Sequence, residues 1–289
     1  MRLEDVPRRH ERLILSDVVL KLTRIFNQAV VRVPAQADVV HVAQAVYFGH
    51  LSGRPMTAHK IVSHDEWITA RQRFLAKEKE FTRLRDELSR ERRELPWEHV
   101  KKEYLFESEQ GRETLADLFG KHTQLIVYHF MYGPDWEIGC RSCSFWADNF
   151  NGIVPHLNAR DVSLVAVSRA PLQKLQTQAR RFGWTFKWVS SLGNDFNFDY
   201  SVSFPQDTLA RGEALYNYGA QKLKSSEMPG ISAFFRDGNQ IYHSYSTYAR
   251  GLDMLNAAYH YLDIAPKGRD EDALAFPMEW VKHRIAYES

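Results

Sequence analysis

The sequence is poor in cysteine, because its 289 residues include only two, Cys140 and Cys143. Two cysteines cannot cross-link a fold of this size, so a small disulfide-stabilised scaffold is excluded. Net charge is nearly absent too, since 38 Lys and Arg residues face 36 Asp and Glu residues, a balance of +2. That balance gives no reason to expect a general affinity for nucleic acid or membranes.

Long hydrophobic runs are also missing. Asp17, Lys21 and Arg24 interrupt the first apolar stretch, which leaves no signal-peptide core. The uncharged run over residues 39–53 is shorter than the roughly 20 residues that a membrane helix needs. We therefore expect a cytoplasmic protein that does not contact membranes. In that reducing compartment, a close cysteine pair is more often catalytic or metal-binding than structural.

Several motifs of cofactor and hydrolase sites are absent. The sequence has no phosphate-binding P-loop, no Gly-x-Gly-x-x-Gly, no Gly-x-Ser-x-Gly and no His-Glu-x-x-His. It has one Cys-x-x-Cys, and His129, His156 and His243 lack the short paired spacing of a zinc finger, so half of a metal site is a weak alternative. We expect neither a cofactor nor a bound metal.

Four regions differ in character along the chain. Residues 1–55 end at a Gly-Arg-Pro turn before Met56, and they are either a spurious or loosely ordered extension or a genuine helical accessory. Residues 56–96 are expected to form a long helical arm, and residues 97–272 a single domain. Residues 273–289 form a polar tail that we expect to be loose.

The arm has a strong helix signature. Ser63 and Glu66 fit a capping box, and Pro96 ends the pattern. Apolar residues recur every seven positions, with Leu84 between them: Trp67, Phe74, Phe81, Leu88 and Leu95. The favoured interpretation is an amphipathic helix over residues 63–95 that lies on the core, with or without dimerisation. A free dimerisation arm or a nucleic-acid-binding helix is the alternative.

The domain alternates strands and helices. Apolar runs predict strands over residues 103–106, 124–131, 162–168, 186–190, 231–236 and 240–245. Helical spacing predicts helices over residues 115–120 and 144–159, from Pro171 onward, and over 251–262. Right-handed crossovers make the early strands parallel, and the turn at Gly238 adds a final antiparallel hairpin. The fold class is α/β with a mixed central sheet.

The cysteine pair lies where a predicted buried strand passes to a helix. Amide groups at a helix N-terminus favour a thiolate, the nucleophilic form of cysteine. We expect Cys140 to attack a substrate disulfide and Cys143, one turn further on, to resolve the mixed disulfide. Arg141 would add positive charge beside Cys140, and Trp136 would wall the site. An inert, packed thiol pair is the alternative.

Six segments resemble a bacterial family of unassigned function, described as thioredoxin-like or predicted dithiol-disulfide oxidoreductases. They are residues 56–63, 80–86, 128–136, 139–148, 165–170 and 245–251. The resemblance covers residues 56–272 and implies a thioredoxin-like three-layer fold, preceded by the long amphipathic helix. The wider superfamily includes thioredoxins and peroxiredoxins. It supplies no known substrate.

The sequence departs from the superfamily at three points. Thioredoxins place a proline directly before the strand that faces the cysteines, whereas here Gly230 separates Pro229 from the predicted strand. The strand before the motif lacks a buried acid and offers His129 as a candidate base, although a histidine packed in the core is the simpler interpretation. Peroxiredoxins carry a threonine where Glu137 stands, which weakens a peroxidase interpretation.

The leading hypothesis is a thiol-disulfide oxidoreductase. Its partners would be a protein or small-molecule disulfide and a dithiol reductant, with no nucleic acid. Tyr245 and Arg250 follow the hairpin and could reach the active face, where Arg250 would pair with an anionic group. Two alternatives remain: a non-catalytic, thioredoxin-like scaffold that forms a homodimer through the 63–95 helix, and, less favoured, a thiol peroxidase.

Overall fold

A computed structural model of the protein describes residues 59–287. The chain divides into two units, and these residues belong to the second, Ala58–Ser289. The predicted extension over residues 1–55 lies outside the described residues. The described part contains an eight-stranded sheet and a separate two-stranded hairpin. None of its helices is long and apolar enough to cross a membrane.

The central sheet is mixed, as predicted. Its strands run in the order β1-β10-β9-β4-β5-β6-β2-β3. Strands β4, β5 and β6 are parallel, β9 is antiparallel to β4, and β10 is antiparallel to β9. The strands just named span Gln124–His129 (β4), Val162–Ser168 (β5), Lys187–Ser190 (β6), Gly230–Asp237 (β9) and Gln240–Tyr248 (β10). Strand β4 therefore lies between a parallel and an antiparallel neighbour.

Short strands complete both edges of the sheet. They are β1 (Glu98–His99) beside β10, and β2 (Leu105–Ser108) with β3 (Gly111–Thr114) beside β6. The strand that we predicted over residues 103–106 begins two residues later, because Tyr104 packs into the core before the β2–β3 hairpin starts. The small hairpin, β7 (Ala214–Tyr216) with β8 (Gly219–Gln221), lies outside the main sheet.

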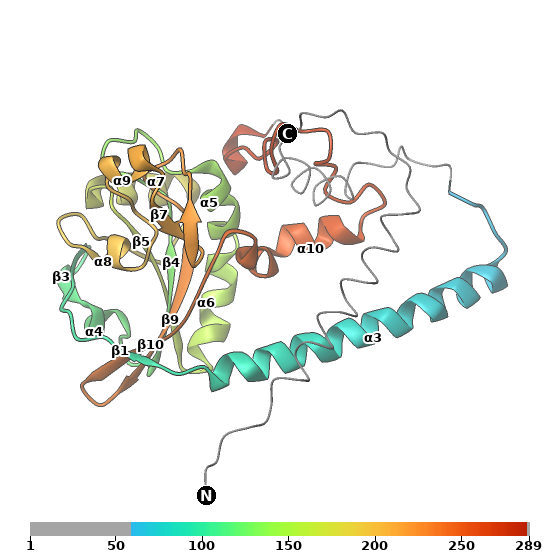
Figure 1. Ribbon diagram of the computed structural model, residues 1–289, viewed down its shortest axis with the longest axis horizontal. Coiled ribbons are helices and arrows are strands. Elements are labelled where there is room, and N and C mark those ends of the chain that lie inside the picture. Colours follow the sequence, from blue (N-terminus) through green and yellow to red (C-terminus); the bar gives the residue numbers. More distant parts are fainter. Residues whose placement is uncertain (1–58, 288–289) are drawn as a thin grey trace, which may run out of the picture. The chain divides into compact units, whose positions relative to one another are not determined.

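Helices cover both faces of the sheet. Alternate residues of β4 point to opposite faces: Tyr128 contributes to one core cluster and Val127 to the other. The first face packs against α5 (Arg141–Ala147), α6 (Phe150–Asn158) and α7 (Leu172–Phe182), and the second against α4 (Leu115–Leu118) and α8 (Phe196–Asp199). Figure 1 shows α5 and α6 running beside β4. The thioredoxin-like three-layer arrangement is confirmed.

Two predicted helices are each divided in two. The helix predicted over residues 144–159 breaks between α5 and α6, where the Asn149 side chain donates to the carbonyl oxygens of Phe145 (3.1 Å) and Trp146 (3.3 Å). Such side chains compete with the backbone for helix carbonyls. The helix predicted over 251–262 becomes a 3₁₀ segment, η1 (Ala249–Leu255), and α10 (Ala257–Ile264). Asn256 separates them by capping α10.

The long helix α3 (His64–Glu94) has the predicted capping box, in which Ser63 and Glu66 bond reciprocally. The expectation that its apolar stripe lies on the core is wrong, because no residue of α3 is buried. The sheet face is already covered by α5, α6 and α7. Near its C-terminal end, α3 contacts the sheet through Arg92, whose guanidinium lies 4.8 Å from the ring centre of Tyr245.

The C-terminal segment packs against the domain, although we expected it to be loose. Val281 is fully buried, and the Trp280 indole donates to Glu271 at 2.6 Å. Glu271 also accepts from the Tyr259 hydroxyl at 3.0 Å, which ties the segment to α10. The segment carries enough apolar side chains to be held by burial despite its polar composition.

Candidate active site

The two cysteines lie at the start of α5, directly after the loop that follows β4. Cys140 is the N-cap residue, and its backbone N–H donates to the Met131 carbonyl oxygen at 3.0 Å. Both thiols are free in the structure. Cys140 is partly exposed, whereas Cys143 is buried, so Cys140 is the more accessible of the two thiols. The division into an attacking and a resolving thiol stays a prediction.

The residue before Cys140 is held on both sides. The Gly139 N–H donates to Gln178 Oε1 at 2.8 Å, and its carbonyl oxygen lies 3.0 Å from His283 Nε2 of the C-terminal segment. A Cβ atom at Gly139 would lie 2.7 Å from the Phe130 ring, so only glycine fits here. These contacts fix the position from which Cys140 faces solvent.

Cys140 is acidic for a thiol. Its pKa is lowered from 9.0 to about 6, chiefly because the Cys143 thiol donates a hydrogen bond to its sulfur. Burial opposes this shift, and the backbone amides of Cys143 and Ser142 together with the Ser142 hydroxyl reinforce it. Near pH 7 Cys140 is therefore mainly the thiolate that nucleophilic attack requires. We expected Arg141 to favour the thiolate. Its side chain is exposed, however, and the groups that lower the Cys140 pKa are those of Cys143 and Ser142.

Cys143 has the opposite character. Burial and the neighbouring Cys140 sulfur raise the pKa of the Cys143 thiol well above its ordinary value. Two groups work against that rise: the Met131 N–H, which donates to Cys143 Sγ at 3.4 Å, and the Tyr128 hydroxyl. The pair thus consists of one thiolate and one protonated thiol that shares its proton with it.

Tyr128 and His129 are adjacent on β4 but face different sides of the sheet. The Tyr128 side chain points toward the cysteines, and its buried hydroxyl has no hydrogen-bond partner of good geometry among the described residues. His129 points to the other face, where its Nε2 lies 2.8 Å from Ser232 Oγ. Burial lowers the His129 pKa to about 3. His129 is thus a core residue and not a base for the cysteines.

A pocket of about 420 Å³ opens above the cysteine pair. Both cysteines, Tyr128, Pro229 and Arg250 line it. Most of the other lining side chains are apolar, and they include Met131, Trp146, Met228, Leu252, Phe276, Pro277 and Met278. Mainly apolar pockets with a few polar groups are typical of ligand sites. The C-terminal segment thus supplies part of the wall around Cys140.

Pro229 occupies the position directly before β9, because the strand begins at Gly230 and not at Ile231 as predicted. The segment before Pro229 is anchored by Glu227, a buried carboxylate that accepts from Arg169 at 2.9 Å and from Ser203 at 2.6 Å. This anchoring fixes the wall of the pocket opposite α5. The peptide bond before Pro229 is trans.

Three predicted supporting residues lie elsewhere. Trp136 packs against the core beside Gly133, Arg141 points to the surface, and Tyr245 lies under Arg92 of α3. None of the three lines the pocket above the cysteines. Arg250 does line it, and its guanidinium pairs with Asp253 at 3.1 Å.

Sequence reasoning missed Tyr128, Ser142 and the C-terminal wall. The signal for Tyr128 was available, because side chains alternate along a strand and Tyr128 shares its face with Phe130. The signal for the wall was the apolar content of the tail, in Phe276, Met278 and Trp280. Ser142 had no distinguishing signal.

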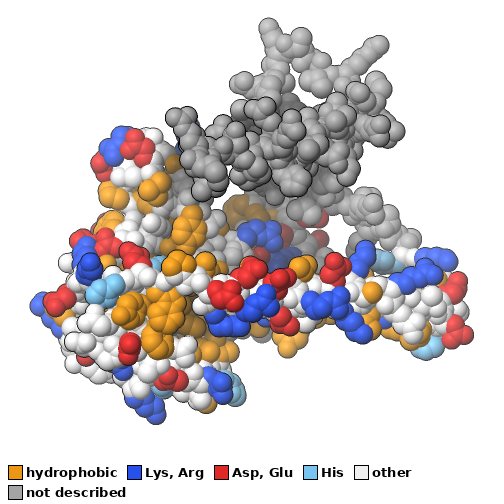
Figure 2. Space-filling view, turned by 60° about the horizontal axis from the view of Figure 1, so that its bottom comes forward, with side chains coloured by type: hydrophobic (Ala, Val, Ile, Leu, Met, Phe, Trp, Pro, Cys, Tyr) orange, Lys and Arg blue, Asp and Glu red, His pale blue; other side chains and the backbone are white. Residues whose placement is uncertain are grey.

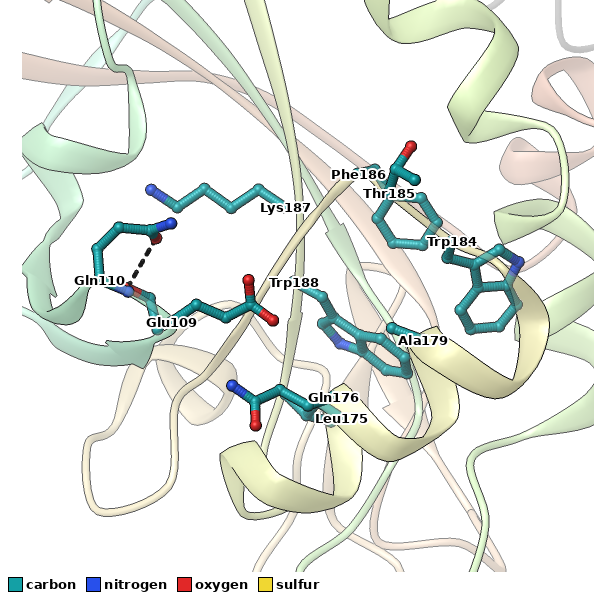
Figure 3. Close-up of a pocket in the computed structure, with 11 residues that line it drawn as sticks. Glu109, Gln110, Leu175, Gln176, Ala179, Trp184, Thr185, Phe186, Lys187 and Trp188 are labelled. Atoms are coloured by element: carbon teal, nitrogen blue, oxygen red, sulfur yellow. Dashed lines mark hydrogen bonds between the residues drawn. The ribbon is translucent and has the colours of Figure 1, made fainter.

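A second pocket, of about 300 Å³, is lined by residues from the β2–β3 turn, α7 and β6. In Figure 3 the Glu109 side chain extends from that turn toward Trp188, and Gln176 approaches from α7. Its lining includes neither cysteine nor histidine. Within residues 59–287, no three His, Cys, Asp or Glu side chains converge in a way that could hold a metal ion. The cysteine pocket is therefore the candidate site.

The mixed sheet with helices on both faces is a thioredoxin-like fold. The chain belongs to the family described as "Bacterial protein of unknown function (DUF899)", whose model matches residues 56–287. A comparison with curated proteins found no match.

Solved structures similar to this chain include peroxidoxin BcpB from Mycobacterium tuberculosis (11% identity, TM-score 0.40, 56% of this chain and 94% of that one). Peroxiredoxin Q from Xanthomonas campestris is 16% identical, with a TM-score of 0.36 over 56% of this chain and 91% of its own. A peroxiredoxin-like protein from Aquifex aeolicus is 14% identical, with a TM-score of 0.35 over 51% and 72%.

Proposed function

We propose that the protein is a thiol-disulfide oxidoreductase in which Cys140 attacks and Cys143 resolves. The observation that carries the proposal is the contrast between the two thiols. Cys140 is partly exposed in a pocket and has its pKa lowered to about 6, whereas Cys143 is buried and has its pKa raised. A merely packed, inert pair gives no reason to expect one accessible thiol of low pKa beside one buried thiol of raised pKa.

The reaction has two exchange steps. The Cys140 thiolate attacks a substrate disulfide R–S–S–R′, so a Cys140–S–S–R bond forms and R′–S⁻ leaves. Cys143 then attacks the Cys140 sulfur, so the Cys140–Cys143 disulfide forms and R–S⁻ leaves. The protein loses two electrons, which the substrate disulfide gains. The Cys143 proton passes to a leaving thiolate.

The charge on Cys140 controls when the second step can occur. While Cys140 is a thiolate, its charge keeps Cys143 protonated. Once Cys140 has entered the mixed disulfide that charge is gone, and the pKa of Cys143 falls. The Met131 N–H already donates to Cys143 Sγ, and the unpartnered Tyr128 hydroxyl beside it is available to donate to the new thiolate. Tyr128 thus takes the place of the buried acid that the sequence lacks on β4.

The pocket indicates which substrates fit. Its largely apolar wall favours a disulfide flanked by apolar groups, because Arg250 at its edge is already paired with Asp253. The cycle needs an external dithiol to reduce the Cys140–Cys143 bond. A cytoplasmic location would supply such a reductant.

The test is a coupled disulfide-reduction assay with insulin and a small aromatic disulfide as substrates. Cys140→Ser should abolish turnover. Cys143→Ser should stop after one exchange and accumulate a mixed disulfide at Cys140, visible by mass spectrometry. His129→Leu, a change on the other face of β4, is the control and should keep its activity. Equal activity in wild type and both cysteine variants would end the proposal.

The same variants separate the alternatives. Peroxide attack also uses a thiolate, but the Glu137 side chain is exposed and offers no hydroxyl to a peroxide at Cys140. Peroxide consumption without disulfide reduction would favour a thiol peroxidase. Failure of both reactions, with an ordinary pKa measured at Cys140, would favour the non-catalytic scaffold.

A further inference from the structure

The helix α3 presents an apolar stripe to solvent. Its four members within the helix, Trp67, Phe74, Phe81 and Leu88, are between 54% and 66% exposed, and each follows the last by seven residues. Leu95, seven residues further on, is the C-cap residue. A straight α-helix drifts from a seven-residue repeat, so a repeat kept over three heptads indicates a left-handed supercoil with a partner helix. Figure 2 shows charged side chains of both signs along this helix, with hydrophobic side chains between them.

The charges beside the stripe identify the partner. When the stripe is taken as heptad position a, the g positions are Glu66, Arg73, Glu80 and Glu87, and the e positions are Arg71, Glu78, Arg85 and Arg92. In a parallel two-stranded coiled coil, each g residue faces the e residue five positions later on the partner. The pairs are 66 with 71, 73 with 78, 80 with 85 and 87 with 92. All four pairs join opposite charges.

The antiparallel arrangement lacks this match. When the helix is centred on an antiparallel copy of itself, Arg71 faces Arg92 and Glu66 faces Glu87, so two of the four flanking pairs join like charges. The other two, Glu78 with Arg85 and Arg73 with Glu80, join opposite charges. Like charges at these flanking positions are destabilising. The charge pattern therefore favours a second copy of the same helix, in parallel and in register, over an antiparallel one.

We propose that α3 forms a parallel, in-register, two-stranded coiled coil with α3 of a second copy of the chain. This proposal is independent of the redox function. The d positions are Ala70, Lys77, Leu84 and Glu91. Two of them are polar, which weakens the seam, so we expect an equilibrium between monomer and dimer that depends on protein concentration.

Charge reversal tests the pairing. In the full chain, Glu80→Lys places two like-charged pairs in the dimer and should weaken dimerisation by about tenfold. The double variant E80K/R85E restores opposite charges and should recover the wild-type association constant. Asp86→Lys makes the same charge change on the outer face of the helix and is the matched control. Sedimentation velocity over a concentration series gives the association constants, and equal constants for E80K and D86K would contradict the pairing.

Cross-linking tests the orientation. In the full chain with Cys140→Ser and Cys143→Ser, single cysteines are introduced as Ala70→Cys or Glu91→Cys, near the two ends of the helix. A parallel pair brings each position beside itself, so each variant should form disulfide-linked dimers on oxidation. An antiparallel pair would link only a mixture of A70C with E91C, and that result would overturn the orientation. A wild-type chain that sediments as a monomer throughout would overturn the proposal, whatever then covers the stripe.

Discussion

The two faces of β4 offer a comparison within one strand. Tyr128 and His129 are neighbours, both are buried, and each has one polar atom without a partner of good geometry. Tyr128 faces a pocket that contains two free thiols. His129 faces a closed network in which Ser232 Oγ lies 2.8 Å from Ser246 Oγ, and His243 Nε2 lies 2.7 Å from the same Ser246 atom.

The difference shows why a polar residue on a core strand is not in itself a sign of chemistry. The histidine is the more common catalytic residue, yet its neighbours are aromatic rings and serines, and burial keeps it neutral. In the proposed reaction, the tyrosine has a role because the Cys143 thiol that it faces loses a proton. The side of the sheet to which each side chain points, more than its residue type, distinguishes Tyr128 from His129.

After loss of the attacking thiol itself, the largest expected effect on the reactive face comes from Cys143→Ser. Without the resolving thiol, the mixed disulfide at Cys140 has no internal exit, so turnover should fall by at least ~10³-fold. A single-turnover assay should still show release of the first thiolate. If turnover survives this change, Cys143 is not the resolving group.

The pH dependence of Cys140 is the next largest effect. Because its pKa is about 6, its rate of alkylation by iodoacetamide should rise through pH 6 and level off, whereas an ordinary thiol rises through pH 9. Folding lowers this pKa, so the reduced wild type should gain stability over Cys140→Ser as the pH rises from about 6 to 9, and lose that gain as it falls. Chemical unfolding at several pH values measures this difference in stability. An alkylation rate that rises only near pH 9 would contradict the assigned thiolate.

Tyr128→Phe should act at the resolving step alone. Loss of a hydroxyl that stabilises a thiolate costs about 1.5 kcal/mol, which slows resolution roughly tenfold. The first exchange, measured as a burst of released thiolate, should keep its rate. Slowing of both steps alike would indicate a packing defect in place of this role.

His129→Leu should have the smallest effect on the reaction. It removes a buried hydrogen bond to Ser232 and should lower the free energy of unfolding by about 1–3 kcal/mol. Disulfide reduction per folded molecule should stay within about twofold of wild type, because surface and core changes away from a site act through stability. Loss of redox activity in a folded His129 variant would break the comparison between the two faces.

Much of the fold was predictable from the sequence because it rests on local patterns. The strand over Val162–Ser168 and the capping box at Ser63 are written in consecutive residues. The cysteine pair was found for the same reason. The walls of the pocket were harder, since Tyr128 and Met278 are about 150 residues apart and meet only through packing.

The predicted packing of helix α3 on the core was wrong. Its seven-residue repeat was visible, but a single sequence does not say whether an apolar stripe is covered by its own domain or by another copy. Trp136 and Tyr245 lie close to the site in sequence or topology, yet neither lines the pocket, because Trp136 packs beside Gly133 and Tyr245 lies under Arg92 of α3.

The C-terminal wall has a consequence for synthesis. Chains are made from the N-terminus, and domains fold as they emerge. Both cysteines come near the middle of the chain and the last strand of the sheet ends at Tyr248, whereas Phe276, Met278 and His283, which complete the pocket and hold Gly139, are among the last residues made. A chain cut short near residue 270 would thus carry the acidic thiol without its enclosure. Such a fragment should react with thiol reagents of every size. The accessibility of Cys140 to a large reagent therefore reports whether the C-terminal segment has been made and has packed against the domain.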